Sequence, residues 1–255
     1  MIGVRELYNK LNKEISPALS CEWDNDGLMC SGDPDKEVKR ALLALDVTKD
    51  TVKRAKEINA DLIVSHHPLI FRPVKALNNE SASAAKAIEL IKSGVSVFSF
   101  HTRLDAHERG VNDILAKTLG IKDTEPFGTE GEMIGRIGYA EKRPLEGFAL
   151  FVKEALGADR VSLIDGGRPV CRVALCGGDG KDFLEAAIES GADTYVTGSM
   201  SYNSMLDAYD TGINIIEAGH YFTEAPVLKV LETMIKEADR GIETVYFDSN
   251  AVKTL

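Results

Sequence analysis

The feature of this chain that most constrains its fold is an internal similarity between two segments that lie 132 residues apart. The segment RALLALDVTKDTVKRAKEINADLIV (40–64) aligns without a gap on RVALCGGDGKDFLEAAIESGADTYV (172–196), and nine of the 25 positions are identical. Each segment has the pattern of an apolar strand, an amphipathic helix and a second apolar strand. Convergent patterning is the simpler explanation. A repeated unit is favoured because each segment is followed by a further strand and a His-x-x-x-acid motif, His101–Asp105 or His220–Glu224.

Apolar runs of strand length alternate with helical patterns along the rest of the chain, which is typical of largely parallel sheets covered on both faces. We therefore expect an α/β protein of two similar domains that face one another. The polar, turn-rich segment IKDTEPFGTEGE (121–132) predicts a boundary, which gives halves of 1–125 and 126–255, with the C-terminal segment able to pack back on the first half. Strands are expected at 40–46, 61–65, 95–100, 133–139, 160–164, 171–175, 194–197, 213–218 and 243–248, with helices near 49–59, 81–93, 110–119, 145–156, 181–190, 201–211 and 223–238.

Charge and composition narrow the classes of partner. The formal net charge of −10 argues against a nucleic-acid partner and against an anionic membrane surface. No apolar run reaches the 18 or so residues of a membrane span, and residues 1–16 carry scattered charges unlike a signal peptide. The four cysteines form no Cys-x-x-Cys pair, so we expect reduced thiols in a cytoplasmic protein.

Every histidine except His107 lies at or just past the carboxyl end of an expected strand. His66 and His67 follow the apolar run DLIVS, and His101 and His220 each follow another strand. Ligands of open α/β sheets bind at the carboxyl ends of strands, where loops converge on one crevice. Adjacent residues of a regular strand point to opposite faces, so two adjacent histidines reach one site only if the strand ends between them. Pro68 enforces such an end.

Imidazole and carboxylate ligands without a nearby thiolate suit zinc, iron, nickel or manganese. The candidates outnumber the ligands of an ordinary zinc site and suit two metal ions that share a bridging carboxylate. His101 is either a sixth ligand or a residue that hydrogen-bonds a ligand. The five candidate ligands are His66, His67, Asp105, His220 and Glu224.

Other motifs carry less information. The turn CGGDGKD (176–182) could present N–H groups to an anion, but its spacing favours a simple tight turn. The segment EWDNDGLMCSG (22–32) has the composition of a loop. Asp46 either caps the helix that follows it or lies near the site, and the cap is the favoured interpretation. His107, in a polar run, is expected to lie on the surface.

Several of these segments together resemble the GTP cyclohydrolase I type 2 homologue family, also called the NIF-three-like metal proteins. EWDNDGL, LALDVT, ADLIVSHHPLIF, HTRLDA, TGS and EAGHYFTE occur in that family's order over nearly the whole chain. The resemblance implies two α/β domains around a dinuclear metal site and a homohexamer built as a trimer of dimers. It implies the same five ligands, with Glu224 as the bridge, and this chain is the short form without an inserted domain. The family commonly has an acidic residue after the glycine at Gly198 and a histidine shortly beyond, where this chain has Ser199 to Asn203.

Two functional classes follow. The first is a metal-dependent hydrolase acting on a nucleotide or related cyclic small molecule, for which the resemblance implies GTP as a candidate substrate. The second is a non-catalytic protein that handles or delivers metal. The two classes differ in their need for an open coordination position and a substrate pocket. No catalytic residue beyond the metal ligands is assigned by the sequence.

Overall fold

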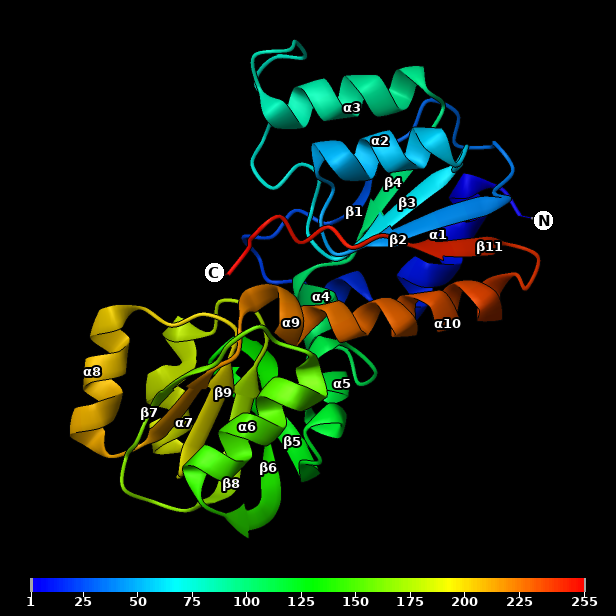
Figure 1. Ribbon diagram of the computed structural model, residues 1–255. Helices are drawn as coiled ribbons and strands as arrows, with labels where there is room; N and C mark the ends of the chain where they lie inside the picture. The colour runs from blue at the N-terminus through cyan, green and yellow to red at the C-terminus, as the bar shows by residue number, and fades with distance from the viewer. Residues whose placement is uncertain (1, 255) are drawn as a thin grey trace. The chain divides into compact units, whose positions relative to one another are not determined.

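The computed structural model describes residues 2–254, which form two compact units (Figure 1). The first unit comprises residues 2–104 and 228–253, and the second comprises residues 105–227. The segment 121–132, expected to separate the halves, instead forms a hairpin of β5 (Lys122–Thr129) with β6 (Glu132–Arg143) inside the second unit. Residues 122–126 are exposed on an edge strand, which explains both the polar composition and the tolerance of Pro126.

The first unit is built on a five-stranded sheet. All its central strands are parallel, and β1 pairs antiparallel at one edge with β4. The strand β1 lies in the segment 22–32 that was expected to be a loop, because its short edge position needs no long apolar run. In spatial order the strands are β1 (Gly27–Cys30), β4 (Ser96–Ser99), β3 (Leu62–Ser65), β2 (Arg40–Ala44) and β11 (Glu243–Tyr246).

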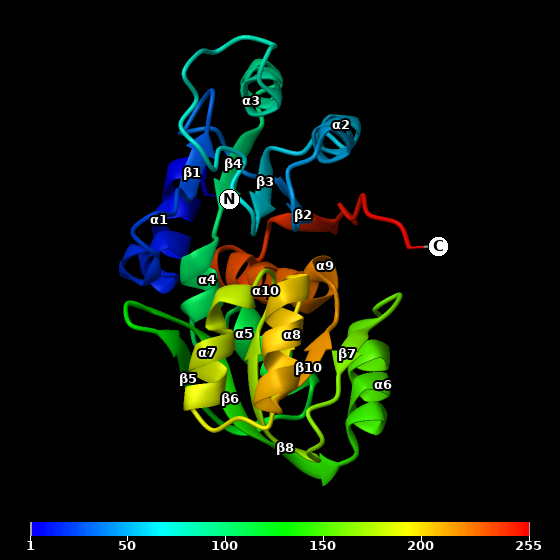
Figure 2. The same cartoon turned by 90° about the vertical axis from the view of Figure 1, so that its left-hand side faces the viewer.

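Helices cover both faces of this sheet, with α2 (Lys49–Glu57) and α3 (Ala82–Lys92) on one face (Figures 1 and 2). Leu42 and Ile63 belong to the core beneath them. The opposite face is covered by α1 (Val4–Glu14), whose Tyr8 ring packs on Phe98, and by α10 (Leu228–Ala238), which lies against α1. Alternate strand residues thus serve two cores, which explains the nearly continuous apolar runs of β2, β3 and β4.

The second unit is built on a six-stranded mixed sheet. Its centre, β8 to β10, is parallel, and the remaining pairs are antiparallel. This arrangement repeats the β2, β3 and β4 core of the first unit, as the internal similarity predicted. In spatial order the strands are β5, β6, β8 (Val170–Cys176), β9 (Thr194–Thr197), β10 (Asn214–Glu217) and β7 (Ser162–Ile164).

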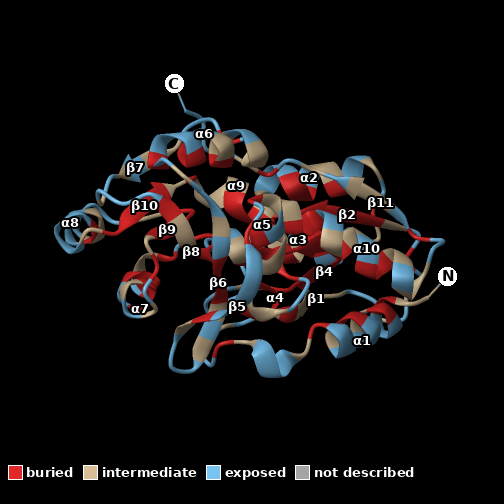
Figure 3. Ribbon diagram, turned by 90° about the horizontal axis from the view of Figure 1, so that it is seen from below, coloured by how far each residue is buried: buried red, intermediate tan, exposed pale blue. Residues whose placement is uncertain are grey.

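The second sheet is also covered on both faces. Val173 and Leu175 of β8 pack with α5 (Val111–Thr118) and α6 (Leu145–Leu156). Ala174 and Cys176 pack on the other side with α7 (Leu184–Glu189) and α8 (Tyr202–Thr211). Figure 3 shows burial concentrated on central strands such as β9, whereas β5 and α8 are largely exposed.

The prediction of an α/β protein with mostly parallel sheets is confirmed. Among the described residues no helix is both long and apolar enough to span a membrane, and all four cysteines are free thiols. Two short helices were not expected. The first is α4 (Thr102–Ala106), which begins directly after His101. The second is α9 (His220–Glu224), which spans the second His-x-x-x-acid motif. The described short 3-10 helices are η1 (Pro17–Leu19), η2 (Lys181–Phe183) and η3 (Ala225–Val227).

Candidate metal centre

His66 and His67 leave β3 where the sequence predicted, at the carboxyl end of a buried parallel strand. The strand ends at Ser65, whose hydroxyl donates to the carbonyl oxygen of His67 at 2.9 Å. This turn brings both imidazoles to one side, with ring centroids 4.9 Å apart. His66 is fully buried, and its Nδ1 lies 2.9 Å from the carbonyl oxygen of Phe100. The Nδ1–H of His66 therefore donates to a backbone acceptor.

Asp46 is not the helix cap that the sequence suggested. The cap of α2 is Thr48, whose hydroxyl accepts the backbone N–H of Thr51 in a reciprocal capping box. The Asp46 carboxylate instead lies 2.8 Å from Nδ1 of His67 and accepts a hydrogen bond from the Nδ1–H. Ser249 also anchors Asp46, because its hydroxyl accepts the backbone N–H of Asp46 at 3.0 Å. Asp46 thus fixes the orientation and tautomer of His67.

His101 is held by the segment that composition had marked as a loop. Its Nδ1 lies 2.8 Å from Oδ1 of Asp24, and its backbone N–H donates to Asp26 at 3.0 Å. The other Asp24 oxygen accepts both the N–H and the hydroxyl of Thr102 at 3.0 and 2.6 Å. Burial alone would raise the pKa of Asp24, but the hydrogen bonds from His101 and Thr102 outweigh it and lower the pKa well below its ordinary value of 3.8. Asp24 therefore remains ionised and oriented.

The three imidazoles form a compact cluster within the first unit. The His101 centroid lies 5.3 Å from that of His66 and 5.6 Å from that of His67, and one nitrogen of each ring lies within 4.8 Å of the others. An acceptor at each Nδ1 leaves Nε2 as the nitrogen that can coordinate a metal. The fold therefore fixes three Nε2 atoms at the carboxyl ends of β3 and β4.

The second unit contains a cluster of its own around α9. His220 and Glu224 are one helical turn apart, with Nε2 3.2 Å from Oε2. A carboxylate oxygen of Asp105 lies within 4.8 Å of one of Glu224. Only 7% of the surface of Asp105 and 4% of Glu224 is exposed. Two nearly buried carboxylates this close favour a cation or a shared proton, because like charges repel strongly at low dielectric.

The glycine turn after β8 makes room for this second cluster. A Cβ on Gly178 would overlap Oε1 of Glu224 and lie 3.2 Å from Nε2 of His220. The turn does not offer its N–H groups to an anion. The N–H groups of Gly177, Gly178 and Gly180 instead donate to Asn112, Thr223 and Thr197 at 2.8, 3.0 and 3.1 Å. These bonds support the tight-turn interpretation of CGGDGKD.

Gly198 is the second unit's equivalent of His66. The backbone carbonyl oxygen of Thr197 accepts the N–H of Ala218 at 2.9 Å. In the first unit the carbonyl oxygen of Ser65 accepts the N–H of Phe100 at 3.0 Å in the same way. A Cβ on Gly198 would lie 2.6 Å from both the carbonyl oxygen of Gly178 and Oγ1 of Thr223, so a side chain does not fit. The departure from the family pattern at 199–203 leads into α8, where Ser201 caps the helix.

Cys176 lies close to the acidic cluster but is a poor ligand. Burial raises the pKa of its thiol well above 9.0, and the negative charges of Asp105 and Glu224 raise it further. The thiol is therefore protonated. His107, expected on the surface, lies outside both clusters, and its Nδ1 accepts the backbone N–H of Arg109 at 3.1 Å. The donor set of imidazoles and carboxylates fits a divalent metal, as the sequence indicated.

The sequence identified all six clustered residues, three in each unit, but it assigned no role to Asp24 and favoured a capping role for Asp46 over a place near the site. Asp24 and Asp46 lie 77 and 21 positions from the imidazoles they hold. The only signal was the density of acidic residues in EWDNDGL and the aspartate that ends LALD.

Known proteins resemble this chain along almost its whole length. The model of the Duf34/NIF3 family (NGG1p interacting factor 3) matches residues 2–251. A Clostridium perfringens protein named GTP cyclohydrolase 1 type 2 homolog is 36% identical over 243 residues, which cover 91% of this chain and 92% of that protein. A Pyrococcus abyssi protein with the same name is 34% identical over 248 residues, covering 96% and 97%.

Solved structures agree on the fold. The crystal structure of a Staphylococcus aureus hypothetical protein superposes with a TM-score of 0.88 at 25% identity, covering 100% of this chain and 99% of that one. The structure of a Bacillus cereus protein related to NIF3 gives the same TM-score at 22% identity, covering 99% of each chain.

Proposed function

This chain belongs to the Duf34/NIF3 family, and we propose that it binds two divalent metal ions and acts as a metal-dependent hydrolase. The proposed ligands are His66, His67, Asp105, His220 and Glu224, with Glu224 as the bridge. The observation that carries the proposal is the adjacent pair His66 and His67, whose Nδ1 atoms both have fixed acceptors, which leaves each Nε2 as the nitrogen that could coordinate a metal.

His101 is proposed as a positioning residue rather than a ligand. Its tie to ionised Asp24 keeps a polarised imidazole next to His66 and His67. Nitrogen and oxygen donors suit zinc, iron, nickel or manganese, and affinity alone does not discriminate among them. Such ions, when bound, polarise a substrate and lower the pKa of water to about 7. The chain's own contribution is to fix the donors and to hold Glu224 and Asp105 nearly buried.

The metal content tests the first part of the proposal. Protein purified without chelator or affinity tag should contain about two divalent ions per chain by elemental analysis. Glu224→Gln should lose both ions, because one oxygen of the proposed bridge becomes a weakly coordinating amide. His107→Ala is the control and should leave the metal content unchanged. A wild-type content of zero or one ion after careful loading would contradict the dinuclear site.

The proposed substrate class is a nucleotide or a related cyclic small molecule, with GTP as the first candidate. Metal-loaded protein should release formate or phosphate from GTP or another member of a nucleotide panel. His67→Ala and Asp105→Ala should abolish that release. If no compound turns over, or if turnover survives both substitutions, the second candidate function, metal handling without catalysis, replaces the hydrolase.

A homohexamer built as a trimer of dimers is proposed from family membership. One surface feature supports self-association: α8 exposes Tyr202, Leu206 and Tyr209 on one side, at fractions of 75, 46 and 64%. Light scattering should therefore give a mass of about six times the chain mass of 27.7 kDa. Leu206→Asp should lower that mass if this stripe is part of the interface. A wild-type monomer in solution would reject the hexamer.

A further inference from the structure

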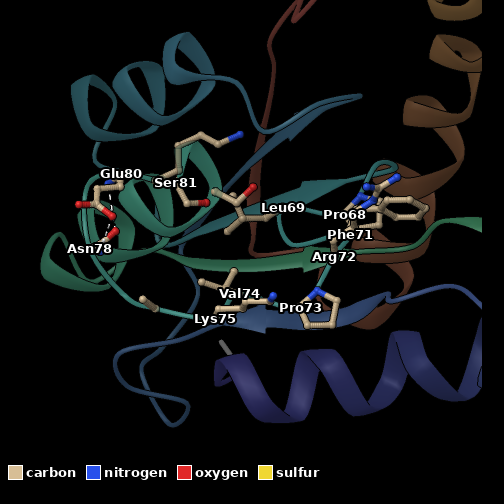
Figure 4. Close-up of a pocket in the computed structure, with 13 residues that line it drawn as sticks. Pro68, Leu69, Phe71, Arg72, Pro73, Val74, Lys75, Asn78, Glu80 and Ser81 are labelled. Carbon is tan, nitrogen blue, oxygen red and sulfur yellow. Dashed lines mark hydrogen bonds between the residues drawn. The ribbon is translucent and has the colours of Figure 1, made fainter.

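The connection between β3 and α3 lines a cavity of the first unit that is open to solvent and is not lined by the proposed metal ligands (Figure 4). Its volume of about 640 Å³ falls in the range of roughly 300–1,000 Å³ that is usual for small-molecule pockets. The lining residues all lie within 68–86, a segment that begins directly after His67. A ligand in this cavity would therefore lie on the segment that leaves the imidazole cluster.

The cavity is positively charged in a protein whose net charge is −10. Its lining includes Arg72, Lys75 and Lys86 but only one acidic residue, Glu80. Lys86 is held in place, because its ammonium group donates to the carbonyl oxygen of Val47. Glu80 is turned toward its own loop, where its carboxylate accepts the side-chain N–H of Asn78 at 3.2 Å, as Figure 4 shows. The cavity therefore attracts anions.

An aromatic pair connects the cavity with the imidazole cluster. The Phe71 ring, which lines the cavity, lies edge-to-face with His101 at a centroid distance of 5.9 Å. Trp23 packs on the same two rings, 6.0 Å from Phe71 and 6.2 Å from His101. Both side chains are about half exposed, at 43% for Phe71 and 53% for Trp23. Exposed ring surface of this kind can stack on a nucleobase.

We propose that this cavity binds the phosphate groups of a nucleoside polyphosphate through Arg72, Lys75 and Lys86, with the base against Phe71 and Trp23. Arginine and lysine are the side chains that recognise phosphate, Arg72 by paired N–H donors and the lysines as point charges. Binding of phosphate here requires no metal. That the bound nucleotide is also the substrate rests on the proposed hydrolase function.

The test is calorimetric titration of tripolyphosphate into metal-free protein, prepared with a chelator that is then removed. Wild-type protein should bind, and the affinity should fall as salt is raised from about 50 to 300 mM, because exposed charges are screened. Arg72→Ala/Lys75→Ala should bind roughly tenfold or more weakly, since two charge-assisted contacts are lost. Both side chains are exposed, so the double variant should keep its circular dichroism spectrum and melting temperature.

The matched control is Lys53→Ala/Arg54→Ala, which removes the same charge from the exposed surface of α2 in the same unit. It should bind tripolyphosphate like the wild type. Equal losses in the two double variants would show a general charge effect and overturn the site. The fluorescence of Trp23, the single tryptophan, should be quenched by GTP but not by tripolyphosphate. Quenching by both ligands, or by neither, would contradict the placement of the base.

The outcomes for this cavity and for the metal site are separable. If tripolyphosphate binds only to metal-loaded protein, the cavity inference fails and the metal proposal stands. If the chain takes up no metal but binds tripolyphosphate through Arg72 and Lys75, the hydrolase proposal fails and the phosphate site stands.

Discussion

Asp61 and Asp193 occupy the same position in the two units, and each carboxylate accepts the backbone N–H groups of two consecutive residues near the beginning of the neighbouring parallel strand. For Asp61 the donors are Lys39 and Arg40, at 2.9 and 3.1 Å. For Asp193 the donors are Cys171 and Arg172, which lie 132 positions further on, at 3.0 and 2.7 Å. The identical aspartates of the sequence repeat thus accept hydrogen bonds from equivalent backbone groups.

Asp61→Asn should destabilise the protein in a pH-dependent way. Burial would raise the pKa of Asp61, but hydrogen bonds from Lys36, Lys39 and Arg40 outweigh it and lower the pKa below 3.8. A lowered folded-state pKa stabilises the fold above the ordinary value, and this stability is lost as the pH falls through and below 3.8. Urea unfolding should show a loss of about 1–3 kcal/mol at pH 7 that shrinks at pH 3. Equal losses at the two pH values would contradict this.

Asp46→Ala should weaken metal binding without removing a proposed ligand. Asp46 fixes the Nδ1–H of His67, and outer carboxylates of this kind typically contribute about 10–100-fold to affinity. Competition with a chromophoric chelator for Zn²⁺ would measure the loss. Asp50→Ala, which removes an exposed carboxylate from α2, is the control and should keep wild-type affinity. Equal affinity in the two variants would mean that the Asp46 contact does not orient His67.

Gly178→Ala separates backbone strain from disruption of the acidic cluster. Gly178 has φ +68°, so alanine there should cost about 1–3 kcal/mol, and its Cβ would also displace Glu224. Gly157→Ala is the matched control, because Gly157 has φ +64° with no atom within 4 Å of the added Cβ. Thermal unfolding should show a loss for both variants, whereas elemental analysis should show metal loss only for Gly178→Ala. Full metal content in that variant would count against Glu224 as a ligand.

Arg103→Met should be strongly destabilising. The guanidinium is 1% exposed and donates to Asp26, Asn12 and the carbonyl oxygen of Ile15 at 2.9, 2.7 and 3.1 Å. Its removal leaves the buried Asp26 carboxylate without its ion-pair partner, at a cost of about 3–5 kcal/mol.

The comparison for this prediction is Arg5→Ala, which breaks an exposed ion pair with Asp35 at 3.8 Å. That change should cost less than about 1 kcal/mol. Urea denaturation of both variants would measure the contrast, and similar midpoints would show that the burial of Arg103 does not govern its contribution.

The sequence predicted those parts of the fold that burial imposes. The runs that became β2, β3, β8 and β9 are apolar because they are covered on both faces, and Pro68 correctly marked the turn that groups His66 with His67. The exposed strand β5 lacks that signal, and its segment was predicted to be the boundary between the halves. The roles of Asp24 and Asp46 depend on contacts between distant segments, which local patterns do not encode. The chain leaves the first unit at 104/105 and re-enters it at 227/228, because its C-terminal segment adds β11 to the first sheet.

That return has a consequence for synthesis. The sheet of the first unit is completed by β11, residues 243–246, which pair with β2 some 200 positions earlier. A ribosome releases the chain from its N-terminus onward, so β2 emerges long before its edge partner exists. The second unit, continuous over 105–227, is available in full before α10 and β11 are made. The second unit is thus the first part of the chain able to finish folding. The first unit can complete its sheet only after β11 has been synthesised.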